Sequence, residues 1–255
     1  MPSFASYPSL KDRAVLVSGG GSGIGAGVVE HFAEQGAKVG FVDLDEPASL
    51  ALVETVRRKG QPAPVFRKCD VRDTRAYQAA IGEIAGALGP IGVLVNNAAR
   101  DDRHALDEVT EEFWNERMAV NLRHQYFAVQ SVAPGMRKAG GGSIVNLSSM
   151  SYVAMTPNLS VYQAAKAAVI GMTRGLARDL GGDGIRVNSV MPGWIMTERQ
   201  IKLWLTPQSE ADLMAQQCLK EKLYPPDIAR MILWLSADDS RLVTAQNFIV
   251  DGGRN

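Results

Sequence analysis

Short apolar runs alternate with longer segments of helical composition along this chain of 255 residues, and this alternation limits the possible folds. Apolar runs of this length, bounded by glycine and polar turns, predict buried strands at residues 14–18, 38–43, 65–68, 93–96, 143–147, 185–191 and 248–250. Helical segments lie between them at residues 24–35, 46–59, 74–88, 111–136 and 161–180. Strands joined through helices run parallel and have helices on both faces. The sequence therefore predicts an α/β fold with one doubly wound parallel sheet of about seven strands.

The chain shows no linker, low-complexity segment or internal repeat, so we expect a single domain over residues 1–255. Within it, the long helical segment should break near Pro134, because proline lacks the backbone N–H that a helix interior uses. Residues 194–225 add helical sequence after the sixth strand. An insertion at the carboxyl end of a parallel strand lies where ligands bind, so we predict a substrate lid there.

Composition excludes several classes of partner. The 27 basic and 27 acidic residues cancel, and no basic stretch favours a nucleic acid or an anionic membrane surface. No apolar run approaches the roughly 20 residues of a membrane span. Residues 1–8 lack the features of a signal peptide, and two cysteines are too few for a disulfide framework. We expect a cytoplasmic protein whose partner is a small molecule, without a membrane or a nucleic acid.

A glycine-rich turn, Ser18-Gly-Gly-Gly-Ser-Gly-Ile-Gly25, joins the first strand to the first helix. Glycine at positions 19, 23 and 25 allows a sharp turn and a close approach to a pyrophosphate at the helix N-terminus. Asp43 ends the next strand, where its carboxylate can accept hydrogen bonds from ribose hydroxyls. It would repel a 2′-phosphate, and no Arg or Lys occurs in the four residues that follow. This pattern predicts a Rossmann fold that binds NAD rather than NADP; the alternative is that Asp43 is a surface turn residue.

Tyr162 and Lys166 are four residues apart in a helical segment, with Ser149 thirteen residues upstream. Positions i and i+4 lie on one face of a helix, so the phenol and the ammonium can share a site. A nearby cation lowers the pKa of a tyrosine below its reference of about 10, as a general base at neutral pH requires. The alternative is an ordinary solvated helix face.

Together these features resemble the short-chain dehydrogenase/reductase family over nearly the whole chain. Further motifs carry the resemblance: Cys69-Asp-Val71, Val95-Asn-Asn-Ala-Ala99, Val120-Asn-Leu122 and Arg186-Val-Asn-Ser-Val-Met-Pro-Gly193. Ser18 and Ala99 depart from the family pattern, which has Thr and Gly there. The resemblance implies four catalytic residues: Asn121, Ser149, Tyr162 and Lys166. It implies cofactor contacts from Gly19, Ser22, Gly23, Ile24, Gly25, Asp43, Asp70, Val71, Asn97, Tyr162, Lys166, Pro192, Ile195 and Thr197. It also implies a homo-oligomer, either a dimer or a tetramer.

A narrower resemblance points to bacterial aldose 1-dehydrogenases of the D-xylose, L-arabinose, L-fucose and galactose type. It rests on four segments: 101–104, 121–124, 193–200 and 215–220. The resemblance implies NAD-dependent oxidation of the anomeric C1 hydroxyl of a pentose or hexose to the aldonolactone. Tyr162 would be the general base, Lys166 would lower its pKa, Ser149 would orient the hydroxyl, and Asn121 would hold a water that relays the proton.

A sugar needs many hydrogen-bond partners, because an unpaired buried polar group costs on the order of 1–3 kcal/mol. The candidate substrate contacts are Arg103, Asn158, Gln163 and Trp194, although a solvated loop is the alternative for the charged residues 100–104. No residue spacing predicts a metal site. Two other functions stay open: a dehydrogenase or ketoreductase for a non-sugar secondary alcohol, and an NAD-binding sensor without catalysis. A polar loop argues against a lipid substrate, and the full catalytic set argues against a sensor.

Overall fold

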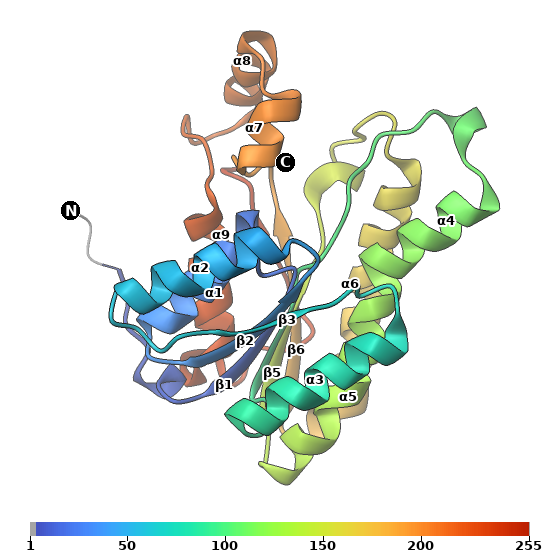
Figure 1. The fold of residues 1–255 in the computed structure, drawn as a ribbon. Coiled ribbons are helices and arrows are strands. Elements are labelled where there is room, and N and C mark those ends of the chain that lie inside the picture. The colour runs from blue at the N-terminus through green and yellow to red at the C-terminus, as the bar shows by residue number, and fades with distance from the viewer. Residues whose placement is uncertain (1–3, 255) are drawn as a thin grey trace.

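The expected strands pair in one parallel sheet with the order β3-β2-β1-β4-β5-β6-β7 (Figure 1). The structure is a computed structural model that describes residues 4–254, so residues 1–3 and 255 of the expected domain lie outside the described residues. The strands are β1 (Ala14–Ser18), β2 (Lys38–Asp43), β3 (Val65–Lys68), β4 (Val93–Asn96), β5 (Gly142–Leu147), β6 (Ile185–Pro192) and β7 (Asn247–Val250). The predicted fold class is confirmed.

Helices cover both faces of this sheet (Figure 1). One face carries α1 (Gly23–Glu34), α2 (Glu46–Arg58) and α9 (Pro225–Ser236). The other face carries α3 (Thr74–Leu88), α4 (Glu111–Met118), α5 (His124–Lys138) and α6 (Ser160–Leu180). Two short helices, α7 (Glu198–Trp204) and α8 (Pro207–Gln216), stand beyond the carboxyl end of the sheet. The strand order changes direction at β1, which lies between β2 and β4.

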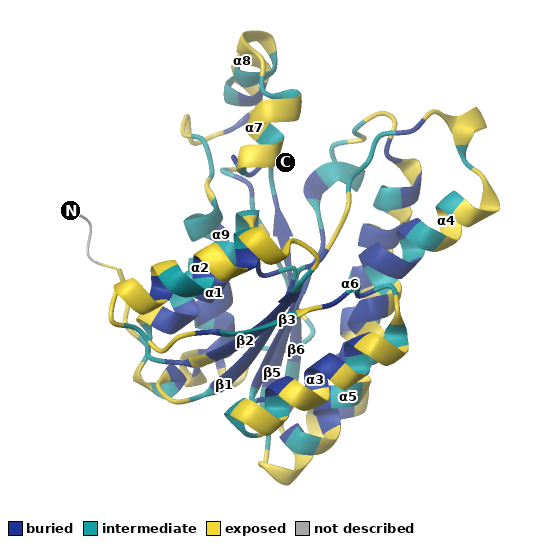
Figure 2. Cartoon of the chain, viewed as in Figure 1, coloured by how far each residue is buried: buried dark blue, intermediate teal, exposed yellow. Residues whose placement is uncertain are grey.

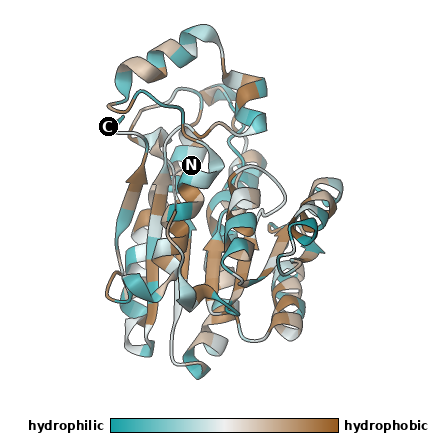
Figure 3. Ribbon diagram, turned by 90° about the vertical axis from the view of Figure 1, so that its left-hand side faces the viewer, coloured by the Kyte–Doolittle hydropathy of each residue, from teal (hydrophilic) through white to brown (hydrophobic). Residues whose placement is uncertain are grey.

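The central strands are buried on both faces, which explains why they read as continuous apolar runs (Figure 2). Alternate residues of β1 belong to opposite layers of the core: Val15 and Val17 pack in the layer of α1 and α9, and Leu16 packs in the layer of α3 and α5. Figure 3 shows the same division, with hydrophobic strands between helices that carry hydrophilic residues on their outer sides. The two layers of the core thus hold the sheet between them.

The expected helix break near Pro134 is wrong. Pro134 lies inside α5, which continues to Lys138. The helical region is interrupted earlier, by a π-helical turn at Ala119–Arg123 between α4 and α5. Proline is tolerated because Pro134 and Gln130 are both exposed, so water can bond the carbonyl oxygen of Gln130 that loses its N–H partner. Such turns are frequent at functional sites, and this one contains Asn121, one of the predicted catalytic residues.

The insertion between β6 and α9 contains α7 and α8, and its end is joined to the end of the chain. Leu219 N donates to Gly252 O at 2.9 Å, and Cys218 N donates to Gly253 O at 3.0 Å. These bonds anchor the segment after α8, while α7 extends over the carboxyl edge of the sheet (Figure 1). Its function as a lid stays a prediction. Within residues 4–254, no helix combines the length and the apolar character needed to cross a bilayer.

Candidate active site

A cavity of about 650 Å³ opens at the carboxyl end of the sheet, where the loops after β1, β2, β4, β5 and β6 meet α7. In doubly wound sheets this edge, at the change of strand direction, is where ligands bind. Most predicted site residues line it: Gly19, Ser22, Ile24, Gly25, Asp43, Asp70, Val71, Asn97, Arg103, Ser149, Tyr162, Lys166, Pro192, Trp194, Ile195 and Thr197. Four predicted residues do not line it: Gly23, Asn121, Asn158 and Gln163.

The glycine turn after β1 has a backbone that other residues could not adopt. Gly19 has a φ of +66°, in the left-handed region. A Cβ atom on Gly25 would lie 1.8 Å from the carbonyl oxygen of Gly19, so the helix starts directly against the turn. Ser22, which precedes α1, makes no side-chain cap. The first-turn N–H groups of α1 can therefore donate to an anion such as a pyrophosphate.

Asp43 ties the end of β2 to this turn. Its Oδ2 accepts a hydrogen bond from Gly21 N at 2.8 Å, and its Oδ1 accepts from Asp45 N at 3.0 Å. Each carboxylate oxygen has a second acceptor site, so Asp43 can still bind hydroxyl groups in the cavity. The shape of the glycine turn and this acceptor fit the pyrophosphate and ribose of a dinucleotide.

Asp70 and Cys69 occupy the next part of the same wall. A side-chain ion pair with Arg72 at 2.6 Å lowers the pKa of Asp70, so this carboxylate stays charged. Burial, assisted by the neighbouring carboxylates, raises the pKa of the Cys69 thiol to about 11. A thiol with so high a pKa is a poor nucleophile at neutral pH, and Cys69 serves as a small packing residue.

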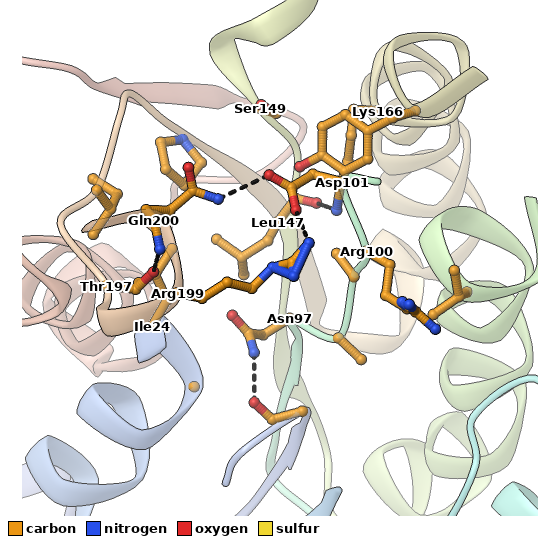
Figure 4. A pocket seen from close by; sticks show the side chains of 18 of the residues that line it. Ile24, Asn97, Arg100, Asp101, Leu147, Ser149, Lys166, Thr197, Arg199 and Gln200 are labelled. Atoms are coloured by element: carbon orange, nitrogen blue, oxygen red, sulfur yellow. Dashed lines mark hydrogen bonds and ion pairs between the residues drawn. The ribbon is translucent and has the colours of Figure 1, made fainter. Parts of the chain in front are cut away.

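Tyr162 and Lys166 lie one turn apart on α6 and both face the cavity. The Lys166 ammonium is buried, donates to the carbonyl oxygen of Leu147 at 2.8 Å, and lies 5.7 Å from the centre of the Tyr162 ring. Ser149 follows β5 at the same end of the sheet (Figure 4), and its hydroxyl donates to that of Ser151 at 3.1 Å. The structure thus brings three of the four predicted catalytic residues to one wall of the cavity.

The pKa of Tyr162 differs from the sequence-based expectation. Burial raises it, the Asp101 carboxylate raises it further, and the Ser149 hydroxyl acts in the opposite direction. Burial also lowers the pKa of Lys166, to about 7, against a smaller opposing effect of Asp101. Desolvation outweighs the attraction between the pair that the i, i+4 spacing suggests.

Asn121 is the fourth predicted catalytic residue, and it lies behind the cavity wall. It is buried in the π turn, where its Oδ1 accepts from Arg100 N at 2.9 Å and its Nδ2 donates to Arg100 O at 3.0 Å. Its side chain therefore holds the loop after β4. The water-relay function expected for it stays a prediction.

Two of the predicted substrate contacts hold loops. Gln163 donates from Nε2 to the carbonyl oxygens of Ser151 at 2.9 Å and Thr156 at 2.6 Å. Asn158 is exposed, and its carbonyl oxygen accepts from His104 N at 3.0 Å. Gln163 supports the segment that follows Ser149 through its side chain, and Asn158 joins the same segment to the loop 100–104 through its backbone.

The other two predicted substrate contacts, Arg103 and Trp194, line the mouth of the cavity. The Arg103 guanidinium lies 4.8 Å from the centre of the Trp204 ring. Trp194 donates from Nε1 to Gln200 Oε1 at 2.9 Å. The charged loop 100–104 is half-buried against α7 at Asp101, Asp102 and Arg103, so it is more than a solvated loop.

Comparisons with known proteins agree with this geometry. A family model described as Enoyl-(Acyl carrier protein) reductase matches residues 19–255. A protein of Rhizobium meliloti named "Probable galactose dehydrogenase GalD" is 52% identical over 249 residues, covering 98% of this chain and 97% of that protein. The D-xylose 1-dehydrogenase of Caulobacter vibrioides is 47% identical over 251 residues, covering 98% and 99%. This chain belongs to the short-chain dehydrogenase/reductase family.

Among solved structures, a blue fluorescent protein from a metagenomic library, in complex with NADPH, has a TM-score of 0.88. It is 34% identical, and the match covers 96% of this chain and 99% of that chain. The short-chain dehydrogenase/reductase family binds a nicotinamide cofactor, and the glycine turn and Asp43 described above fit one.

The structure also adds residues that the sequence analysis did not name as substrate contacts. These residues also line the cavity: Asp101, Arg199, Gln200, Trp204 and Arg254. The sequence could have indicated Asp101 as a substrate contact, because it belongs to the polar loop 100–104 that follows the fourth strand. No pattern in residues 194–225 distinguishes Gln200 from its neighbours, because only the packing of α7 against the loop after β4 brings it to the cavity.

Proposed function

We propose that this protein is an NAD-dependent aldose 1-dehydrogenase, which oxidises the anomeric C1 hydroxyl of a sugar to the aldonolactone. The observation that best supports this proposal is that one cavity is lined by Tyr162, Lys166 and Ser149. Two polar or aromatic side chains, Arg103 and Trp194, line the same cavity. The naming of two relatives, at 52% and 47% identity, as galactose and D-xylose dehydrogenases supports a sugar as the substrate.

The reaction removes a proton from the C1 hydroxyl and a hydride from C1, which leaves a C=O bond in the lactone. Tyr162, as phenolate, accepts the proton, and the Ser149 hydroxyl orients the substrate oxygen. The glycine turn and Asp43 would hold the oxidised dinucleotide, which would supply the hydride acceptor and a positive charge that favours the phenolate. Lys166 holds the carbonyl of Leu147 at the base of the site and can pass a proton onward, because its pKa of about 7 lies near neutral pH.

NAD, rather than NADP, is the cofactor we propose. Asp43 supports this choice, because its carboxylate lines the cavity at the end of β2 and would repel a 2′-phosphate. Leu44 follows it in the cavity wall, and neither neighbouring side chain offers a cation.

A panel of aldoses with NAD and with NADP tests the proposal, with formation of the reduced cofactor followed by absorbance. We expect turnover of at least one pentose or hexose, with a higher kcat/KM for NAD. Turnover of a hydroxy acid or a steroid alcohol, without turnover of any aldose, would instead support the non-sugar alternative. Cofactor binding without turnover of any alcohol would support the sensor.

We also propose that the enzyme is a cytoplasmic homo-oligomer, a dimer or a tetramer. The outer side of α4 and α5 supports an oligomer, because Trp114 and Tyr126 are 43% and 50% exposed there. The cysteines Cys69 and Cys218 are not in a disulfide bond, as a reducing compartment would require. Light scattering of the purified protein tests the oligomeric state.

A further inference from the structure

One side-chain amide joins the two sides of the cavity mouth. Gln200, on α7, accepts from Trp194 Nε1 at 2.9 Å with its Oε1 and donates from Nε2 to Asp101 Oδ2 at 2.8 Å (Figure 4). Trp194 follows β6, and Asp101 follows β4, so the two residues come from different strands. The Gln200 amide therefore uses its oxygen to hold the Trp194 ring and its N–H group to hold the Asp101 carboxylate.

The Asp101 carboxylate keeps acceptor capacity toward the cavity. Arg199 donates to its Oδ1 at 3.1 Å, and Gln200 donates to its Oδ2. Two oxygens offer about four acceptor sites, so about two sites are left for a ligand. The side chain is 21% exposed and lines the cavity, so it is accessible to a ligand there.

Asp101 lies close to the reacting end of the cavity. Its charge acts on the titration of both Tyr162 and Lys166, and Figure 4 shows it between Gln200 and Lys166. The hydroxyl of a substrate nearest to Asp101 would thus be close to the one that Tyr162 deprotonates. In an aldose, that neighbour is the hydroxyl on the carbon next to C1.

An ion pair alone does not account for this arrangement. The Arg199 side chain is 47% exposed, and it divides its guanidinium between Asp101 and Asp102, at 3.1 and 3.2 Å. Exposed ion pairs of this kind contribute at most about 1 kcal/mol. A carboxylate held by an amide and a guanidinium, at the wall of a cavity, is instead a preorganised acceptor for hydroxyl groups.

We propose that Asp101 accepts a hydrogen bond from the sugar hydroxyl adjacent to C1, and that Gln200 is the positioning residue that sets this carboxylate relative to the Trp194 ring. This inference rests on the proposed aldose dehydrogenase function. It makes the pair Asp101 and Gln200 a determinant of substrate choice, because a sugar without that hydroxyl leaves the buried side of the carboxylate unpaired.

Asp101→Asn tests the first half of the proposal with the best aldose of the panel and its 2-deoxy analogue. Asparagine keeps the size and one acceptor, so the contact with Gln200 can persist. Charged hydrogen bonds contribute about 1.5–3 kcal/mol, so kcat/KM for the parent sugar should fall roughly 10- to 100-fold. The 2-deoxy sugar should lose less than about 3-fold. Equal losses for both sugars, or no loss for either, would overturn the assignment.

Gln200→Glu and Asp101→Asn/Gln200→Glu test the second half. Glutamate opposite Asp101 places two carboxylates together, so the sugar KM should rise by on the order of 10-fold while the KM for NAD stays constant. In the double variant, the amide introduced at position 101 can donate to the new carboxylate, so the added effect of Gln200→Glu should vanish. Additive losses would contradict a positioning function. Gln208→Ala, an exposed glutamine on α8, is the matched control and should change neither KM.

Direct binding separates this inference from the function on which it rests. Calorimetry with Tyr162→Phe, saturated with NAD, measures sugar binding without turnover, and adding Asp101→Asn should weaken it roughly 10-fold or more. A wild-type enzyme that neither oxidises nor binds an aldose would overturn both proposals. An enzyme that oxidises aldoses, and whose affinity is unchanged by Asp101→Asn, would overturn this inference alone. Thermal melting of each variant confirms that the fold is retained.

Discussion

Lys166 donates to the carbonyl oxygen of Leu147, and its ammonium lies 5.7 Å from the centre of the Tyr162 ring. The lysine is thus held by the end of β5 as well as by its own helix. Its position is fixed in the absence of a direct hydrogen bond to the phenol, and both groups are buried together. This shared burial determines how each one titrates.

Replacing Tyr162 with Phe should remove turnover while leaving the cofactor site intact. The change deletes only the hydroxyl that accepts the proton, and loss of a general base costs about 10²- to 10⁴-fold in rate. Initial rates at saturating sugar and NAD measure the loss, and calorimetry measures NAD binding. Tyr224→Phe, at an exposed position just before α9, serves as the control. Residual activity above a tenth of wild type would contradict the assignment of Tyr162 as the base.

The stability contributed by Lys166 should depend on pH. Its pKa is lowered to about 7 in the folded protein, from 10.5. Between these values the unfolded chain binds a proton that the folded protein releases, so stability rises with pH by up to about 1.4 kcal/mol per unit. The free-energy cost of burying the Lys166 amine is greatest below pH 7, and it disappears toward pH 10.5.

Lys166→Met removes this titration. The Tm of the variant minus that of the wild type should therefore decrease as the pH rises from about 7 to about 9.5. The raised pKa of Tyr162 does not interfere, because its stability contribution is lost only above the unfolded pKa of about 10. Lys38→Met, an exposed lysine, should show no such trend. A constant difference in Tm would mean that Lys166 is charged in the folded protein throughout this range.

Asp43→Asn should weaken the preference for NAD. Asparagine keeps an acceptor for Gly21 N but loses the charge that repels a 2′-phosphate. We expect the ratio of kcat/KM for NAD to that for NADP to fall roughly 10- to 100-fold, as removal of about 1.4–3 kcal/mol of discrimination would give. Asp45→Asn, at the neighbouring N-cap of α2, is a matched control that should keep the ratio. A wild-type enzyme that uses NADP better would contradict the function given to Asp43.

Gly25→Ala should destabilise the protein and abolish NAD binding. The new Cβ would lie 1.8 Å from a backbone oxygen of Gly19, which cannot move without opening the turn. A loss on the order of 2–4 kcal/mol in the free energy of unfolding is expected. In contrast, Gly82→Ala in α3 meets no atom of the described chain within 4 Å and should stabilise the helix by about 0.5–1 kcal/mol. Urea unfolding and NAD titration measure both variants.

Arg103→Ala should raise the sugar KM about 10-fold with little change in the KM for NAD. Its Nη1 is buried at the cavity and has no hydrogen-bond partner within residues 4–254, so a substrate hydroxyl can supply one. A hydrogen bond to a charged group contributes about 1.5–3 kcal/mol, which exceeds a tenfold change. Arg58→Ala, an exposed residue of α2, is the control. Equal changes in both KM values would indicate a general disturbance of the loop.

The sequence predicts the sheet well because its central strands are buried on both faces, so that burial and apolar composition coincide. The glycine turn and the Tyr162–Lys166 pair are predictable for a similar reason, since local spacing determines where they lie. The place of Gln163 beside Tyr162 suggests a substrate contact, but the fold directs its amide to Ser151 O and Thr156 O. The contact of Gln200 with the cavity could not be predicted, because it depends on how α7 packs against a loop almost a hundred residues earlier in the chain.

The mouth of the cavity is built differently from its floor. Tyr162, Lys166 and Ser149 stand on α6 and the end of β5, elements that the core of the sheet holds in place. Asp101, Trp194 and Gln200 stand on two connecting segments that side-chain hydrogen bonds join, from Gln200 and Arg199 to Asp101. Such an enzyme can exchange one sugar for another during evolution by altering these two segments, while the machinery that moves the proton and hydride is inherited unchanged.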